Sequence, residues 1–233
     1  MLTMILFLSI RKLFPGFNLN KTICISSFSK KLLTCIVLLT LCSFFGFTQK
    51  HSYSIIKSGK TIGTCSVNRQ QSENKVSYSI SSDAKTGFIL NILVNVMIEE
   101  IFESGTLVNS TFIRKINGIE TIRKTADKTI DSYKMNGKSA NTKIIFPKIE
   151  YTMASMYLIE PAKRKFVYSE YYQQNIPVIA LGVNRYLLLF PDGNKSFYTY
   201  VSGICTEIET HTDWALLHII LNNITSQNLC SDL

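Results

Sequence analysis

The sequence lacks the short motifs that mark most catalytic and cofactor-binding sites. Its six cysteines include no CxxC pair and no Cys/His cluster, which leaves a zinc site without support. It also has no glycine-rich phosphate loop and no GxSxG turn around a nucleophilic serine. We therefore expect a protein that is not an enzyme, with no metal, no cofactor and no catalytic residue.

Acidic residues are absent from residues 1–48, and this absence accounts for much of the net charge. The full chain of 233 residues has 25 basic and 16 acidic residues, a formal net charge of +9. Residues 1–48 hold five of the basic residues, so the remainder has 20 basic against 16 acidic residues and a net charge of +4. A small surplus spread over a domain is typical of a solvated surface. We expect no nucleic-acid partner.

The N-terminal segment has the pattern of a targeting signal. A lysine pair precedes an apolar run over residues 32–47, as in a secretory signal peptide. The small residues Gly46 and Thr48 fit cleavage before Gln49. The run is shorter than the roughly 20 residues of a membrane span, although an uncleaved anchor is the alternative. Residues 1–48 are thus predicted to be a signal peptide or N-terminal anchor. The protein is then exported, periplasmic or part of the cell envelope, and meets a membrane only through this segment if it is uncleaved.

Helical periodicity is scarce after residue 49, whereas period-two alternation is frequent. The strongest hairpin signal lies in residues 184–209, where aromatic runs flank the turn Pro191-Asp192-Gly193-Asn194. Asn117-Gly118 and Asn136-Gly137 are two further turn signals. Strands are predicted over residues 51–56, 61–69, 75–82, 88–102, 106–116, 119–128, 129–135, 139–146, 165–172, 176–181, 186–190, 197–200 and 204–209.

Two segments depart from this alternation. Residues 150–157 are predicted to form a short helix or an irregular crossover. Residues 214–221 are apolar on both faces, which favours a final buried strand, with a terminal helix as the alternative. The pattern as a whole predicts an all-β fold: a single antiparallel meander sheet, curved into a barrel or half-barrel, with one short helical crossover. Residues 49–233 show no repeat and no linker, so we expect a single β-rich domain.

Three cysteines remain after the N-terminal segment, and the sequence leaves their state open. Cys65 and Cys205 would pair if their strands were neighbours, since an exported protein sits where disulfides persist. The alternative is that they are buried free thiols that pack as small apolar groups. Cys230 makes the number odd.

A set of short motifs runs from about Tyr53 to Glu209. They are Gly59-Lys60-Thr61-Ile62-Gly63-Thr64, Asn117-Gly118, Met156-Tyr157-Leu158-Ile159-Glu160-Pro161, Tyr168-Ser169-Glu170, the run from Tyr186 to Asn194, and the run from Gly203 to Glu209. In these motifs the chain resembles an uncharacterised family of exported bacterial proteins, catalogued only as a domain of unknown function. More remotely, the layout is similar to periplasmic half-barrel proteins whose curved sheet holds lipid or acyl chains. The resemblance implies export and a curved sheet, and no reaction.

One row of polar residues offers an alternative function. Glu207, Glu209, His211 and Asp213 share one face if residues 204–213 form a strand. This arrangement is compatible with a metal-dependent or hydrolytic enzyme. Because Ile204 and Ile208 would point the other way into the core, the row is more simply the solvent face of a strand.

The apolar strand faces carry the leading hypothesis. They predict that the concave side of the sheet binds an apolar or lipid-like small molecule, although a filled core gives the same pattern. The candidate ligand-binding residues are Phe88, Leu90, Ile92, Val94, Tyr186, Leu188, Phe190 and Tyr198. The second hypothesis is an envelope structural or partner-binding module that uses a strand edge or the Trp214 segment to bind an envelope protein.

Overall fold

The computed structural model describes residues 47–86, 92–137, 142–144, 148–212 and 215–222. These residues form a β fold with one short 3₁₀ turn, η1 (Ser155–Tyr157). In the described part, no helix is long and apolar enough to cross a membrane. The strands are β1 (Phe47–Lys57), β2 (Lys60–Ser72), β3 (Lys75–Thr86), β4 (Ile92–Glu103), β5 (Thr106–Ile116), β6 (Ile119–Lys128), β7 (Tyr133–Asn136), β8 (Thr142–Ile144), β9 (Phe166–Ser169), β10 (Gln174–Gly182), β11 (Arg185–Leu189), β12 (Lys195–Val201), β13 (Ile204–Thr212) and β14 (Ala215–Leu221).

The strands follow the period-two pattern of the sequence. In β1, Tyr53 and Ile55 are buried on one face, whereas Lys50 and Ser52 on the other face are exposed. Tight turns separate most of the strands. Asn117 and Gly118 have φ of 50° and 81°, the left-handed values that a two-residue type I′ turn requires between β5 and β6. Local sequence therefore sets both the strands and most of the hairpins.

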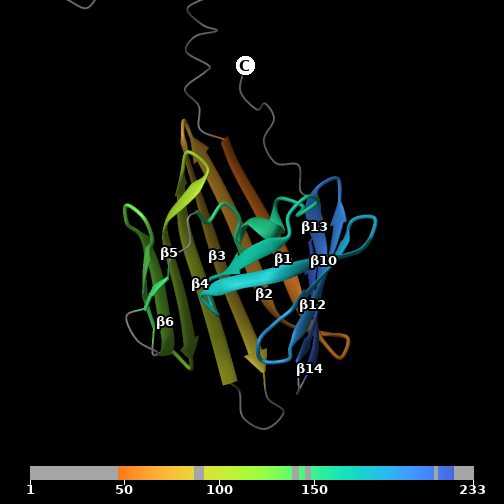
Figure 1. The fold of residues 1–233 in the computed structure, drawn as a ribbon. Coiled ribbons are helices and arrows are strands. Elements are labelled where there is room, and N and C mark those ends of the chain that lie inside the picture. Colours follow the sequence, from red (N-terminus) through yellow and green to blue (C-terminus); the bar gives the residue numbers. More distant parts are fainter. Residues whose placement is uncertain (1–46, 87–91, 138–141, 145–147, 213–214, 223–233) are drawn as a thin grey trace, which may run out of the picture. The chain divides into compact units, whose positions relative to one another are not determined.

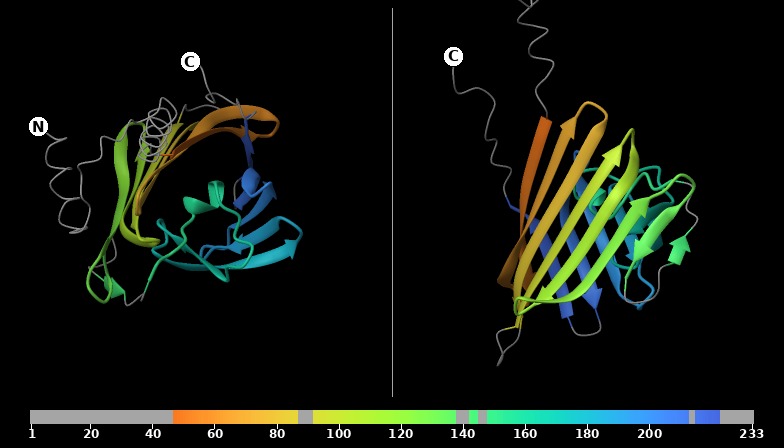
Figure 2. Two further views of the ribbon diagram at one scale, coloured as in Figure 1. Left: turned by 90° about the horizontal axis from the view of Figure 1, so that it is seen from above. Right: turned by 90° about the vertical axis from the view of Figure 1, so that its left-hand side faces the viewer.

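The 14 strands lie in one antiparallel sheet with the order β8-β7-β6-β5-β4-β3-β2-β1-β14-β13-β12-β11-β10-β9. Each strand thus pairs with its sequence neighbours, except that β8 and β9 do not pair with each other. In addition, β1 pairs with β14 and joins the two halves of the meander. This pairing runs from Tyr53 opposite Leu221 to Lys57 opposite Leu217. The sheet curls strongly but does not close through strand pairing, because β8 and β9 remain its two edges (Figures 1 and 2). The predicted curved antiparallel half-barrel is confirmed.

The segment before β9 runs inside the curve of the sheet (Figure 2, left). The Leu107 amide donates to the Ile149 carbonyl at 2.8 Å, and Thr152 forms a parallel bridge with Tyr168 of β9. The Tyr200 hydroxyl then donates to the Met156 carbonyl at 2.8 Å. This inner segment, residues 149–159, therefore packs against both halves of the sheet and is the predicted crossover.

Side chains close the gap between the two ends of the sheet. The turn between β9 and β10 contains Gln173, whose side-chain amide donates to the Thr125 carbonyl at 2.9 Å and to the Asn136 carbonyl at 3.3 Å. Next to it, the Tyr171 ring packs against Phe112 of β5 with ring centroids 5.4 Å apart. The turn between β9 and β10 is thus docked on β5, β6 and β7 without strand pairing.

The structure bears on three further sequence expectations. The strand expected over residues 88–102 is β4, which begins at Ile92, and residues 88–91 lie outside the described part. The two-residue turn at Asn136-Gly137 is wrong, because Met135 pairs with Thr142 and the connection is longer. The predicted cleavage before Gln49 falls inside β1, where Phe47 and Thr48 pair with the end of β2.

Cys65 and Cys205 are buried free thiols, so the second of the two alternatives holds for this pair. The strands β2 and β13 that carry them are separated in the sheet by β1 and β14, and a disulfide needs Cα atoms within roughly 7 Å. Burial raises the pKa of both thiols to about 12. Cys230 lies outside the described residues.

Candidate functional site

A mostly apolar hollow of about 270 Å³ lies between the inner segment and the concave face of β11–β14. Strands β12, β13 and β14 supply its floor, the inner segment supplies one wall, and the turn between β9 and β10 supplies the other. The lining residues are Met153, Tyr157, Ser169, Tyr171, Tyr172, Phe190, Asn194, Ser196, Tyr198, Ile208, Thr210 and Ile219. We call this cavity the hollow.

The wall of the hollow is a chain of aromatic rings held in fixed contact. Tyr171 and Tyr172 meet edge to face with centroids 4.7 Å apart, and Tyr172 stacks on Phe190 at 5.5 Å and 20°. The Tyr172 hydroxyl donates to Asp192 in the turn between β11 and β12, which anchors the ring from outside. Burial raises the pKa of Tyr172, and the hydrogen bond to Asp192 raises it further, so its phenol stays neutral. The apolar wall is therefore preformed.

Few polar groups face this apolar wall. Ser196 and Thr210 bond to each other through their hydroxyls at 2.9 Å across β12 and β13. Tyr198 is buried, and burial raises its pKa, so it is a neutral hydrogen-bonding group. The described residues that line the hollow include no His, Asp, Glu or Lys. The Ser196 and Thr210 hydroxyls accordingly bond to each other and not to the adjacent base that nucleophilic catalysis needs.

A buried carboxyl pair adjoins the hollow. One member, Glu170, follows the lining residue Ser169, and the pair bonds to Thr152 and Ala154, which flank the lining residue Met153. Glu100 of β4 and Glu170 after β9 are only 1% and 3% exposed. Thr152 donates its hydroxyl to Glu100 Oε2 at 2.6 Å, and the Ala154 amide donates to Glu170 Oε1 at 3.2 Å. The pair thus fastens the inner segment to both halves of the sheet.

The electrostatics of this pair keep at least one proton on it. Burial raises the pKa of Glu100 well above its usual range, and the charge of Glu170 raises it further. Burial also raises the pKa of Glu170, against the opposing hydrogen bonds from Glu100 and the backbone. Glu100 Oε1 is buried without a hydrogen-bond partner of ordinary geometry, which adds to the cost of ionising this carboxyl. Glu100 is the neutral member of the pair.

The eight predicted ligand-binding residues are divided among four environments. Phe190 and Tyr198 line the hollow. Tyr186 and Leu188 are buried in the core against the inner segment, and Tyr186 donates to Glu160 at 2.7 Å. Ile92 and Val94 are half-buried in β4, away from the hollow. Phe88 and Leu90 lie outside the described residues.

The row proposed for an enzyme lies on the opposite side of β13. Ile208 is buried and Thr210 lines the hollow, so Glu207, Glu209 and His211 face outward. His211 contacts Glu209, and His218, which the sequence could not place, contacts Glu207 at 2.9 Å. Asp213 lies outside the described residues, and among those described no cluster of three His, Cys, Asp or Glu side chains is arranged to hold a metal.

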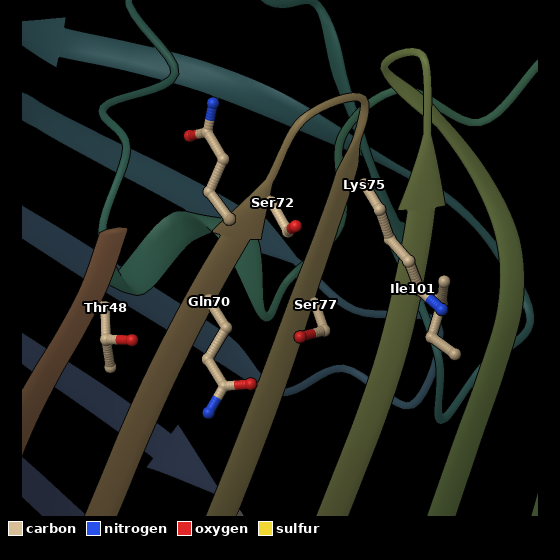
Figure 3. A pocket seen from close by; sticks show the side chains of 7 residues that line it. Thr48, Gln70, Ser72, Lys75, Ser77 and Ile101 are labelled. Atoms are coloured by element: carbon tan, nitrogen blue, oxygen red, sulfur yellow. The ribbon is translucent and has the colours of Figure 1, made fainter. Parts of the chain in front are cut away.

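A second, polar groove of about 550 Å³ lies on the outer face near the hairpin between β2 and β3. Figure 3 shows Thr48, Gln70, Ser77 and Ile101 projecting from the same side of their strands. Lys75 supplies its one charge. Ligand sites usually combine an apolar lining with a few polar groups, and for this reason we regard the hollow as the better candidate.

Sequence reasoning missed most of the hollow and the buried carboxyl pair next to it, and a signal was available only for the carboxyl pair. Glu100 follows Ile98 and precedes Phe102 on the same strand face, so alternation alone places a carboxylate among apolar residues. Tyr171, Tyr172 and Thr210 gave no comparable signal, because their role depends on the docked turn and on the inner segment.

The fold and the site define a class of protein. Its members have a strongly curved antiparallel sheet and an apolar cavity between the concave face of that sheet and an inner segment. A family model, the domain of unknown function DUF6134, matches residues 53–222, and the chain belongs to this family. Among solved structures, the chain is similar to a β-barrel-like protein of domain of unknown function DUF1849 from Brucella abortus. The identity is 10%, the TM-score is 0.49, and the match covers 74% of this chain and 94% of that chain. No curated protein matches the sequence.

Proposed function

We propose that the protein is a non-catalytic binding protein that holds the apolar part of a lipid-like ligand in the hollow. The observation that carries the proposal is the preformed aromatic wall of Tyr171, Tyr172 and Phe190 beside an apolar floor. The volume of about 270 Å³ is just below the roughly 300–1,000 Å³ typical of small-molecule sites. A hollow of this volume can enclose one end of a lipid-like ligand but not the whole ligand. The lack of a general base among the described lining residues supports binding without chemistry.

The proposal places this binding outside the cytoplasm. Its support is the lysine pair and the apolar run in residues 32–47, which have the pattern of a secretory signal. A site of this kind would serve an exported lipid carrier, and it would equally serve a sensor of envelope lipid.

Filling the hollow should abolish ligand binding. In Thr210→Trp, the indole would occupy the space beside Ser196 and Tyr198, so a neutral apolar dye such as N-phenyl-1-naphthylamine should bind at least about tenfold more weakly. A tenfold change corresponds to about 1.4 kcal/mol, less than the roughly 1.5–3 kcal/mol gained by burying one large apolar group. The measurement is a fluorescence titration of residues 49–233 and of the full chain.

The matched control is Thr199→Trp. Thr199 lies on β12 between the inward-facing Tyr198 and Tyr200, so its side chain is on the outer face. The control should bind the dye as the wild type does. Dye binding that is not saturable in the wild type, or that is equal in Thr210→Trp and Thr199→Trp, would contradict a ligand site in the hollow.

A further inference from the structure

Two cations sit on the inner face of the sheet next to the hollow. Arg114 of β5 follows the buried Phe112 by two residues, so both side chains face inward. Lys124 of β6 pairs in register with Phe112 and therefore shares this face. Both cations are half-buried.

Both cations converge on one ring of the hollow. The Lys124 ammonium nitrogen lies 4.8 Å from the Tyr171 ring centroid, and the Arg114 guanidinium carbon lies 6.0 Å from it. Lys124 also donates to the Tyr171 carbonyl oxygen. Tyr171 thus has two positive charges at its ring and lines the hollow as well.

Neither cation has a carboxylate partner among the described residues. Arg123 on the same sheet pairs with Glu120 at 2.7 Å, and Lys148 pairs with Glu150 at 2.7 Å, but no ion pair involves Arg114 or Lys124. The side-chain contact of Arg114 besides the ring is Thr121 at 3.4 Å. Glu170 is adjacent to Tyr171 in sequence but is engaged with Glu100 and the Ala154 amide. Burial lowers the pKa of Lys124, and no nearby carboxylate offsets this.

We propose that the ligand of the hollow is an amphipathic anion whose acidic group binds between Arg114 and Lys124, while its apolar chain follows the aromatic wall. This inference rests on the proposed function and specifies the chemistry of its ligand. Half-buried charges without a counter-ion are costly, and a carboxylate or phosphate would neutralise both through charge-assisted hydrogen bonds.

The aromatic rings connect the two parts of such a ligand. Phe112, Tyr171, Tyr172 and Phe190 form a continuous series with successive centroid separations of 5.4, 4.7 and 5.5 Å. The cations stand at the Phe112 end of the series, and the floor of the hollow lies at the Phe190 end. An acidic head and a chain therefore find complementary groups in that order.

The test compares three probes with the same chain: laurate, dodecyl phosphate and dodecanol. Each displaces N-phenyl-1-naphthylamine from the wild type and from Arg114→Gln and Lys124→Gln. The control variants are Arg123→Gln and Lys115→Gln, which remove the same charges from the exposed outer face of the same strands.

We expect the wild type to bind at least one of the two anions at least about tenfold more tightly than dodecanol. Each inner variant should lose roughly tenfold for that anion and keep its affinity for dodecanol, which also shows that the hollow remains folded. The outer variants should change neither affinity. The anion that the wild type holds more tightly, carboxylate or phosphate, identifies the head group.

Failure of the anionic head group can be distinguished from failure of the proposed function. Wild-type binding of dodecanol and both anions with equal affinity, unchanged in Arg114→Gln and Lys124→Gln, would overturn the anionic head group and leave the hollow as a binding site. A wild type that binds none of the three probes would instead remove the proposed function itself.

Discussion

The free energy of unfolding of the wild type should fall as the pH rises from about 5 to 9, and Glu100→Gln should remove much of this fall. Burial and the charge of Glu170 raise the pKa of Glu100 in the folded protein. The folded state therefore binds more protons than the unfolded state above the usual glutamate pKa of about 4.3. Stability is full below that value and is lost as the pH rises toward the folded pKa, at about 1.4 kcal/mol per pH unit for one proton.

Glu100→Gln replaces neutral Glu100 with a side chain of the same shape that has no ionisable proton. Its amide oxygen can accept from Thr152, and its amide N–H can donate to Glu170. The variant should match the wild type near pH 5 and exceed it near pH 9. A residual slope is expected because burial also raises the pKa of Glu170. Urea denaturation at several pH values measures the difference.

Glu99→Gln is the matched control for this experiment. Glu99 precedes Glu100 on β4 and is exposed on the other face of the strand. Its substitution should leave the pH dependence of stability as in the wild type. Equal slopes for Glu100→Gln and the wild type would mean that Glu100 is ionised in the folded state, contrary to the geometry of the pair.

Among Gly→Ala substitutions at the described glycines, we expect Gly63→Ala to destabilise the protein most. A Cβ at Gly63 would lie 2.1 Å from the Asp83 carbonyl oxygen and 2.6 Å from the Ala84 Cα. Both atoms belong to the backbone of β3, which pairs with β2 at this point, so neither can move without breaking the ladder. Overpacking in a core costs about 1–3 kcal/mol, and a backbone clash of this size should reach or exceed the upper end.

Gly59→Ala supplies the comparison. Gly59 lies in the turn between β1 and β2 with φ of 75° and has open space around its Cα. An alanine there meets only the cost of a left-handed conformation, about 1–2 kcal/mol. Thermal unfolding should therefore rank the wild type, Gly59→Ala and Gly63→Ala in decreasing order of stability. If Gly63→Ala were as stable as the wild type, β2 and β3 would not approach as closely as the structure has them.

These results would bear on binding as well as on folding. The carboxyl pair holds Thr152 and Ala154, and the intervening Met153 lines the hollow. Loss of the pair should therefore loosen one wall of the hollow. The aromatic wall from the turn between β9 and β10 has its own anchors at Gln173 and Asp192.

Local patterns in the sequence were sufficient to predict the strands, most of the turns and which side chains of a strand share the apolar face. Alternation places Tyr186, Leu188 and Phe190 on one face, and Asn117-Gly118 closes a hairpin, because side-chain direction and turn geometry depend on a few adjacent residues. The same locality explains why residues 150–157 were recognised as a departure from the pattern.

Only the tertiary structure decided which part of that face is open. The inner segment covers Tyr186 and Leu188 and leaves Phe190 and Tyr198 at the hollow. The sequence by itself determined an all-β meander with an apolar concave side. The pairing of β1 with β14, the meeting of Glu100 with Glu170, and the approach of Arg114 and Lys124 to one ring join residues far apart in the chain. No local pattern encodes such contacts, because they follow from the curvature and register of the whole sheet.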